Sequence, residues 1–396
     1  MQKINGTIAT PKGFAADGNH CGLKYKNHDI AWLYSMTPAQ AAGVFTTNQV
    51  KAASVTYTKE ILLAGKLQAV VVNSGNANAC TGDEGLKNTK AMAEVTAKKL
   101  QIAPDLVAVA STGIIGKPLP MEKVTAGIES LQKQGIADNF AKAILTTDTF
   151  TKNVVYQTEI DGHCITMAAC GKGSGMIHPN MATMLGFITC DANISSLTLQ
   201  QLLSELTEVT FNQITVDGDT STNDMVLLLA NGAAGGHEIK TKTLAYQKLK
   251  ELLKTVMEDL AKMIAKDGEG ATKLIEVTTN GACDDLIARM ISKSVVGSPL
   301  VKTAIFGKDP NWGRILCAIG YSGSPINPEE VTITLGDQIV YANGLPTVFD
   351  MQKMTAALAE DVIIIFVTLQ QGNGQGKAWG CDLTYDYVKI NALYHT

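Results

Sequence analysis

The chain lacks a hydrophobic run long enough to cross a membrane. Its longest strongly apolar stretch, at 362–369, is only eight residues long, whereas a membrane-spanning helix needs about 20. The first residues, MQKINGT, also lack the apolar core of a signal peptide. We therefore expect a cytoplasmic protein with no membrane partner.

Runs of one charge are absent as well. The 33 basic and 37 acidic residues give a formal net charge of −4, and no basic cluster interleaved with aromatic residues marks a surface for nucleic acid. The eight cysteines include no C-x-x-C pair, which favours reduced, buried cysteines over disulfides or zinc ligands.

Several cofactor motifs are also missing. Neither a G-x-x-x-x-G-K-[ST] phosphate loop nor a G-x-G-x-x-G dinucleotide motif before a helix occurs. The segment 217–228 starts with the spacing of a calcium loop, but it lacks the glycine at position six and the glutamate at position twelve. We predict no bound metal and no bound cofactor.

The residues that are present predict an α/β fold. With 396 residues, 45% of them hydrophobic, the chain can form a large core and more than one domain. Strand-like and helix-like segments alternate over the first three quarters. Strands are expected at 68–73 and 106–110, and helices at 84–101, 121–135, 198–210 and 244–266. The helix at 198–210 is expected to start with Thr198-x-x-Gln201 as a capping box.

The pattern changes near residue 281. A helix at 284–294 is followed by strands that include 331–335 and 362–370, which predicts a smaller C-terminal domain. The expected spatial domains are therefore 1–280 and 281–396. The absence of a Pro/Ser-rich linker indicates that they pack closely.

A glycine-rich run at 172–185, KGSGMIHPNMATML, contains the best candidate nucleophile, Thr183. Its glycines permit unusual backbone angles, Lys172 supplies a cation, and Ala182 leaves the next bond unobstructed. Cleavage of that bond would free an α-amino group with a pKa of roughly 7.7–8.0, a base suited to neutral pH. Taken alone, the run fits a flexible turn before a buried strand at 184–189 better than a catalytic site.

Eight segments, in order along the chain, decide between these alternatives. They are AGVFTTNQV at 42–50, NSGNANACTG at 73–82, STGIIG at 111–116, the run at 172–185, VDGDTSTND at 216–224, DGEGATK at 267–273, DPNWGR at 309–314 and NALYHT at 391–396. With them the chain resembles the ornithine acetyltransferase family, the bifunctional glutamate N-acetyltransferases of arginine biosynthesis. Precursors of that family cut themselves at an Ala-Thr bond followed by Met-Leu.

The resemblance implies a self-processing N-terminal-threonine acyltransferase fold with a larger α/β core and a smaller C-terminal α/β domain. Cleavage between Ala182 and Thr183 would give an α fragment, 1–182, and a β fragment, 183–396, held together as an αβ unit and expected to form α2β2. The implied reaction moves acetyl from N2-acetyl-L-ornithine to L-glutamate through acetyl-Thr183 in a ping-pong mechanism. Family members differ in whether acetyl-CoA is a further acetyl donor, and the sequence leaves this open.

The resemblance also supplies the other site residues. Thr112 and Gly113, after the strand at 106–110, match the family's oxyanion hole. The implied substrate-binding residues are Thr146, Lys172, Thr183, Glu269, Asn391 and Thr396. We assign Glu269 to the side-chain ammonium of ornithine, which glutamate lacks, and we expect the terminal carboxylate of Thr396 at the site.

Other functions stay open at this point. A related self-cleaving amidase or aminopeptidase would pass the acyl group to water, and a paralogous acetyltransferase would serve another pathway. A ligand-binding protein would keep its chain uncut. A serine hydrolase using Ser174 and His178 is a weak competitor because no G-x-S-x-G elbow surrounds Ser174. We place His178 in a turn and give it no catalytic role.

Overall fold

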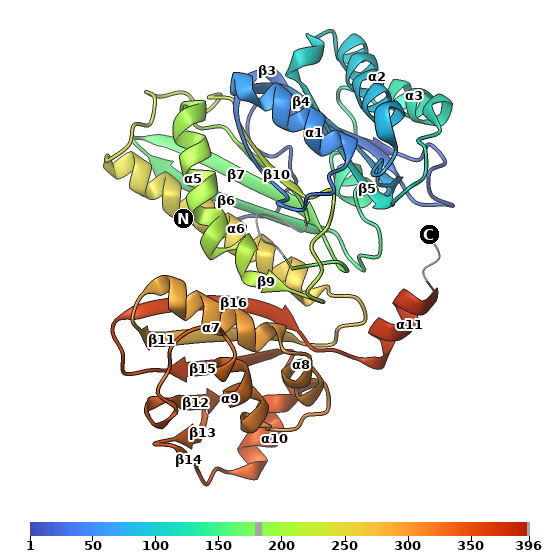
Figure 1. The fold of residues 1–396 in the computed structure, drawn as a ribbon. Helices are drawn as coiled ribbons and strands as arrows, with labels where there is room; N and C mark the ends of the chain where they lie inside the picture. The colour runs from blue at the N-terminus through green and yellow to red at the C-terminus, as the bar shows by residue number, and fades with distance from the viewer. Residues whose placement is uncertain (179–183, 394–396) are drawn as a thin grey trace.

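The computed structural model describes residues 1–178 and 184–393, and a large β-sheet organises the first part of them (Figure 1). Its strands are β1 (Gln2–Lys3), β2 (Phe14–Asn19), β3 (Ile30–Phe45), β4 (Lys66–Asn76), β5 (Val107–Ile114), β6 (Lys152–Ile160), β7 (His163–Lys172), β8 (Leu185–Cys190) and β10 (Met225–Ala230). Within the described residues the order is β1-β6-β7-β8-β10-β3-β4-β5, with β2 paired to β3.

Six helices belong to this part of the chain. They are α1 (Ala53–Ile61), α2 (Gly82–Leu100), α3 (Met121–Ser130), α4 (Asp138–Ala143), α5 (Ser196–Val209) and α6 (Leu244–Lys266) within the described ranges. Helix α6 has the bounds expected from its apolar periodicity, and α2 lies within two residues of the expected helix at 84–101.

The first sheet forms two stacked halves because the long strand β3 belongs to both. Its residues 30–35 pair with β2, and 30–34 and 39–40 pair with β4, whereas 40–45 pair with β10. One buried cluster joins the inner faces of the halves and includes Leu33, Val70, Phe187 and Leu227. Helices α2 and α3 cover the outer face of β4 and β5, while α5 and α6 cover that of β6, β7, β8 and β10. The result is four layers in the order α, β, β, α.

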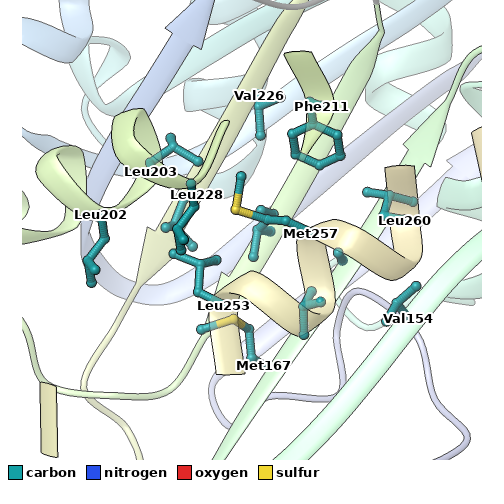
Figure 2. Close-up of a cluster of buried hydrophobic side chains, with 14 of the residues drawn as sticks. Val154, Met167, Leu202, Leu203, Phe211, Val226, Leu228, Leu253, Met257 and Leu260 are labelled. Carbon is teal, nitrogen blue, oxygen red and sulfur yellow. The ribbon is translucent and has the colours of Figure 1, made fainter. Parts of the chain in front are cut away.

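Helices α5 and α6 bury broad apolar stripes against the sheet. Figure 2 shows side chains from α5, α6 and β10 meeting in one cluster, among them Leu202, Leu203, Val226, Leu228, Leu253, Met257 and Leu260. Burying each such side chain contributes roughly 1.5–3 kcal/mol relative to exposure. This layer therefore fixes the strands whose ends line the site described below.

Two helix ends differ from expectation. Ser195, not Thr198, caps α5: its extended backbone lets Oγ accept the N–H of Thr198 at 3.3 Å, so Thr198 already lies in the first turn. Helix α3 ends at Ser130 instead of near 135 because Leu131 is extended and the N–H of Gln132 donates to Asp17 Oδ2 at 2.8 Å.

A second sheet contains the remaining strands. They are β9 (Ile214–Thr215), β11 (Leu274–Ala282), β12 (Thr332–Leu335), β13 (Gln338–Ala342), β14 (Leu345–Pro346), β15 (Val362–Thr368) and β16 (Gly374–Cys381). The order in the described residues is β14-β13-β12-β15-β11-β16-β9. The boundary expected after residue 280 falls inside β11, and the short strand β9 reaches this sheet from the earlier part of the chain.

Four helices pack on the second sheet: α7 (Asp285–Gly297), α8 (Pro299–Phe306), α9 (Trp312–Gly320) and α10 (Met351–Ala359). The two sheets meet across α6, since Trp379 of β16 belongs to the same buried hydrophobic cluster as the apolar side chains of α6. Glu276 of β11 accepts the Trp379 Nε1–H at 3.0 Å and lies 3.2 Å from Lys262 Nζ of α6. The last helix, α11 (Tyr385–Leu393), leaves the second sheet and runs back toward the first (Figure 1).

The cysteines are all free thiols, but the expectation that they are buried holds only in part. Four are exposed: Cys80, Cys164, Cys283 and Cys317. Cys317 is exposed although Ile315 and Ala318 of the same helix are buried, so its position in an apolar run did not predict burial. Among the described residues, none of the helices has the length and apolar character that a membrane span requires.

Candidate active site

Several strand ends meet at one edge of the layered core. The pairings of Lys172 with Leu185 and of Leu185 with Met225 set the end of β7 beside the starts of β8 and β10. The end of β5 reaches the same place, and together these segments line a cavity of about 220 Å³. The cavity brings together six predicted site residues: Thr112, Gly113, Thr146, Lys172, Glu269 and Asn391. Thr183, Ala182 and Thr396 lie outside the described residues, but Met184 also lines the cavity.

The backbone at the end of β5 requires glycine. Gly113 has φ +130°, and a Cβ there would lie 2.4 Å from the carbonyl carbon of Gly75 on β4. The neighbouring Thr112 hydroxyl accepts from Lys172 Nζ at 3.4 Å. A hydroxyl that accepts in this way keeps its own hydrogen to donate. A threonine O–H and the Gly113 N–H are thus the donor types that an oxyanion requires.

Lys172 is 9% exposed, and its charge acts on the nearby carboxylate of Asp148. The Asp148 carboxylate accepts the N–H groups of Gly173 at 2.8 Å and of Thr146 at 3.0 Å. Burial by itself raises the pKa of Asp148, but Lys172 and Lys152 outweigh it and lower the pKa to about 2. Asp148 is therefore ionised at neutral pH and ties together two loops at the cavity wall.

A buried ion cluster lies behind this wall. Lys152 Nζ is 2.7 Å from Asp148 and 2.5 Å from Asp267, with the three side chains 2% exposed or less. Asp267 follows α6 and also accepts the N–H of Thr149 at 3.0 Å. Its backbone carbonyl accepts the Ser174 hydroxyl at 2.6 Å. The cluster joins the end of α6 to both loops that carry predicted substrate contacts.

Glu269 and Asn391 close another side of the cavity. Asn391 Nδ2 of α11 donates to Glu269 Oε2 at 2.8 Å. The Glu269 carboxylate lies over Gly175, where a Cβ would be 2.4 Å from it. Tyr387, one turn earlier on α11, donates to Asp217 Oδ2 at 3.3 Å. These contacts hold the C-terminal helix at the site.

Sequence reasoning assigned no role to two buried polar residues beside the cavity. Asn223 Nδ2 donates to the carbonyls of Ala77 at 2.6 Å and Ser111 at 2.8 Å, which fixes the backbone just before Thr112. Asp224 lines the cavity and is 4% exposed. Burial raises the pKa of Asp224 well above its usual value. Both residues belong to the family segment at 216–224, which could have indicated a role at the site, but their burial depends on tertiary packing.

His178 precedes the segment that contains the predicted scissile bond. Its Nδ1 lies 2.9 Å from Thr215 Oγ1, and its carbonyl accepts the Thr220 hydroxyl at 3.0 Å. Burial and nearby Lys293 lower the pKa of His178 to about 4. At neutral pH the His178 ring is therefore uncharged, and its contact with Thr215 is structural. In residues 1–178 and 184–393 no group of three or more His, Cys, Asp or Glu side chains is arranged to hold a metal ion.

The layered α/β fold and a cavity with a hydroxyl, a glycine N–H and a buried lysine suit an enzyme of the acyltransferase class. A model of the ArgJ family matches residues 15–396, and the chain belongs to that family. This membership confirms the resemblance inferred from the eight segments and the predicted α/β acyltransferase fold. The roles of the individual site residues remain predictions.

Relatives match over full length. The arginine biosynthesis bifunctional protein ArgJ of Staphylococcus epidermidis is 57% identical over 397 residues, and that of Listeria monocytogenes is 56% identical over 398, with 100% of each chain covered. A crystal structure of arginine biosynthesis bifunctional protein ArgJ from Bacillus halodurans is similar at 54% identity and a TM-score of 0.53. That match covers 54% of this chain and 100% of the solved one.

Proposed function

We propose that the protein is a self-cleaving acetyltransferase of arginine biosynthesis that moves acetyl from N2-acetyl-L-ornithine to L-glutamate. One observation carries the proposal: Thr112, Gly113 and Lys172 share a cavity with Met184, the residue directly after Thr183. A nucleophile at position 183 is therefore next in the chain to a cavity with oxyanion donors. The pathway named for the full-length relatives supports the choice of substrates.

Self-cleavage precedes this activity. Thr183 Oγ attacks the Ala182 carbonyl, and hydrolysis of the resulting ester frees the α-amino group of Thr183. The size of a solved relative supports the cut. The whole Bacillus halodurans chain matches 54% of this chain, and the fragment 183–396 is the same share of the sequence, 214/396.

Acetyl transfer then runs in two half-reactions. The α-amino group of Thr183 takes the Oγ proton as Oγ attacks the acetyl carbonyl, and it returns the proton to the departing nitrogen of ornithine. Thr112 and Gly113 donate to the oxyanion in both halves. Glutamate then attacks acetyl-Thr183 and leaves as N-acetylglutamate. One amide replaces another, so the reaction needs no external energy source.

Substrate recognition is assigned to the opposite charges in the cavity. Lys172, 9% exposed, attracts the carboxylate that both amino acids carry. Glu269, held by Asn391 at 2.8 Å, attracts the ornithine ammonium. Thr146 lies on the same cavity wall. A cavity of about 220 Å³ is small compared with drug-sized sites and suits an amino acid derivative.

Three further parts of the proposal concern the whole protein. We propose acetyl-CoA as a second acetyl donor without a bound cofactor, which the word bifunctional in the relatives' names supports. We propose that the fragments stay paired as αβ, because β7 and β8 flank the cut and pair in one sheet. Assembly as α2β2 is proposed from the family resemblance alone. A biosynthetic enzyme of this kind is placed in the cytoplasm, which cell fractionation tests.

The first test is the intact mass of the purified protein under denaturing conditions. Fragments matching 1–182 and 183–396 are expected, while Thr183→Ala should remain a single chain of 42.0 kDa. Cleaved protein should then transfer labelled acetyl from acetylornithine to glutamate. Release of free acetate without N-acetylglutamate would identify an amidase, and an uncut wild-type chain would contradict the mechanism.

A further inference from the structure

Self-cleavage needs a proton acceptor that the mature enzyme does not need. In acetyl transfer the α-amino group of Thr183 accepts the Oγ proton, but in the uncut chain that nitrogen belongs to the peptide bond and has no basicity. Another group must accept the proton when Oγ attacks Ala182. The inference below rests on the proposed self-cleavage and names this group.

Strand pairing fixes Asp224 beside Met184, the residue that follows the predicted nucleophile in the chain. Strands β8 and β10 are parallel with Leu185 opposite Met225, and the N–H of Met225 donates to the carbonyl of Met184 at 3.1 Å. Asp224 is therefore level with Met184, one residue from Thr183. Its own carbonyl accepts the N–H of Thr46 at 3.0 Å. Hydrogen bonds on two sides thus hold the Asp224 backbone.

The Asp224 side chain is buried and incompletely paired. The residue is 4% exposed and lines the cavity together with Thr112 and Lys172. Its Oδ2 has no hydrogen-bond partner among the described residues. Most buried polar atoms have a partner, and leaving one unpaired costs roughly 1–3 kcal/mol. A carboxyl kept in this state at a cavity is typical of a group that handles protons.

We propose that the Asp224 carboxylate accepts the Thr183 Oγ proton during self-cleavage. As Oγ bonds to the Ala182 carbonyl carbon, the proton moves to Asp224. The C–N bond then breaks, and Asp224 passes the proton to the departing nitrogen of Thr183. Water hydrolyses the Ala182 ester, which leaves a carboxylate on Ala182 and the Oγ–H of Thr183, and the proton released passes to the new α-amino group. Asp224 ends as it began, and water is the one further reactant.

The surroundings of Asp224 make its carboxylate a stronger base. Burial raises its pKa, and the Ser221 hydroxyl and Lys172 oppose that rise. Glu269 is the other charged side chain that lines the cavity in the described residues. Because only the ionised form accepts a proton, the cleavage rate should rise with pH up to the pKa of Asp224 and level off above it.

The test times cleavage of newly made full-length chains in cell-free synthesis. Asp224→Asn keeps the size of the side chain but removes its basicity, so cleavage should slow at least about 100-fold. Asp224→Glu should recover part of the rate. The matched control is Asp191→Asn at the other end of β8, where a buried carboxyl accepts the N–H of Thr166 at 2.8 Å. That variant should cleave at the wild-type rate.

Folding is checked against uncut Thr183→Ala, which should melt at about the same temperature as uncut Asp224→Asn. Wild-type speed in a folded Asp224→Asn chain would overturn the inference and leave the proposed function standing. An uncut wild-type chain would overturn both. If Asp224→Asn does not fold, the pH dependence of wild-type cleavage decides. A cleavage rate that rises with pH and then levels off supports Asp224, and a cleavage rate that does not change between pH 5 and pH 9 overturns the inference.

Discussion

The replacement Lys152→Met tests the buried ion cluster behind the cavity. Methionine has nearly the length and volume of lysine but no charge, so it leaves Asp148 and Asp267 without their common cation. Both carboxylates contact Lys152 Nζ, at 2.7 Å and 2.5 Å, and none of the three side chains is more than 2% exposed. The change therefore removes charge compensation with little loss of packing.

The expected loss of folding stability is roughly 3–5 kcal/mol, the usual effect of removing one partner of a buried pair. A pH-dependent contribution comes from Asp148, because Lys172 and Lys152 together lower its pKa from 3.8 to about 2. That depression stabilises the fold by about 2 kcal/mol at neutral pH. Since a lowered pKa stabilises only the ionised form, this contribution is lost as pH falls from about 4 to about 2.

The assay is urea unfolding of cleaved enzyme at pH 7, followed by fluorescence of the buried Trp32 and Trp379. The control is Lys250→Met, which removes an ion pair to Glu205 of 2.5 Å with side chains 34% and 51% exposed. It should cost at most about 1 kcal/mol. Acetyl transfer should also fall in Lys152→Met, because the Asp148 carboxylate orients two cavity loops.

The reasoning would be refuted if the free energies of unfolding of Lys152→Met and Lys250→Met both lay within about 1 kcal/mol of the wild-type value. The cluster would then contribute no more than an exposed ion pair. A stability loss with unchanged kcat and KM would refute only the link between the cluster and the cavity.

Three further predictions concern the cavity itself. Gly113→Ala should block activity and lower the melting temperature, because its Cβ would collide with the Gly75 backbone 2.4 Å away. Acetyl-transfer assays measure the first effect and differential scanning calorimetry measures the second. Thr112→Val should lower kcat roughly 10²–10³-fold with little change in KM for either substrate, and equal kcat would exclude the oxyanion role. Glu269→Gln should raise KM for acetylornithine more than KM for glutamate in steady-state assays. An unchanged ratio of the two KM values would contradict the pairing with the ornithine ammonium.

Long periodic elements could be predicted from the sequence with good bounds. Helix α6 runs from Leu244 to Lys266 as expected, since its apolar residues recur on one face over six turns. Strand β3 could not, because Pro38 interrupts it and normally excludes a central strand. In the structure Pro38 is exposed and falls where the pairing with β4 shifts between Tyr34 and Ala39, so its missing N–H costs the sheet nothing.

The site was predictable only through the family resemblance. Residues such as Glu269 and Asn391 are 122 positions apart, and no local pattern indicates that their side chains meet at 2.8 Å. Without the resemblance, the sequence around Thr112 predicts only a turn, and its contact with Lys172 Nζ at 3.4 Å joins residues 60 positions apart. The role of Asp224 could not be predicted, because an aspartate in a hydroxyl-rich segment normally indicates an exposed turn. Its burial follows from the neighbouring strands.

The position of β8 determines how the enzyme matures. This strand begins two residues after the proposed cut and lies between β7, from the α fragment, and β10, from the β fragment. Both halves of the sheet are therefore formed by one polypeptide before the bond breaks. Maturation should be a first-order event whose rate is the same at any protein concentration. Specific activity should likewise persist on extreme dilution, because no encounter between separate molecules is needed to build the sheet.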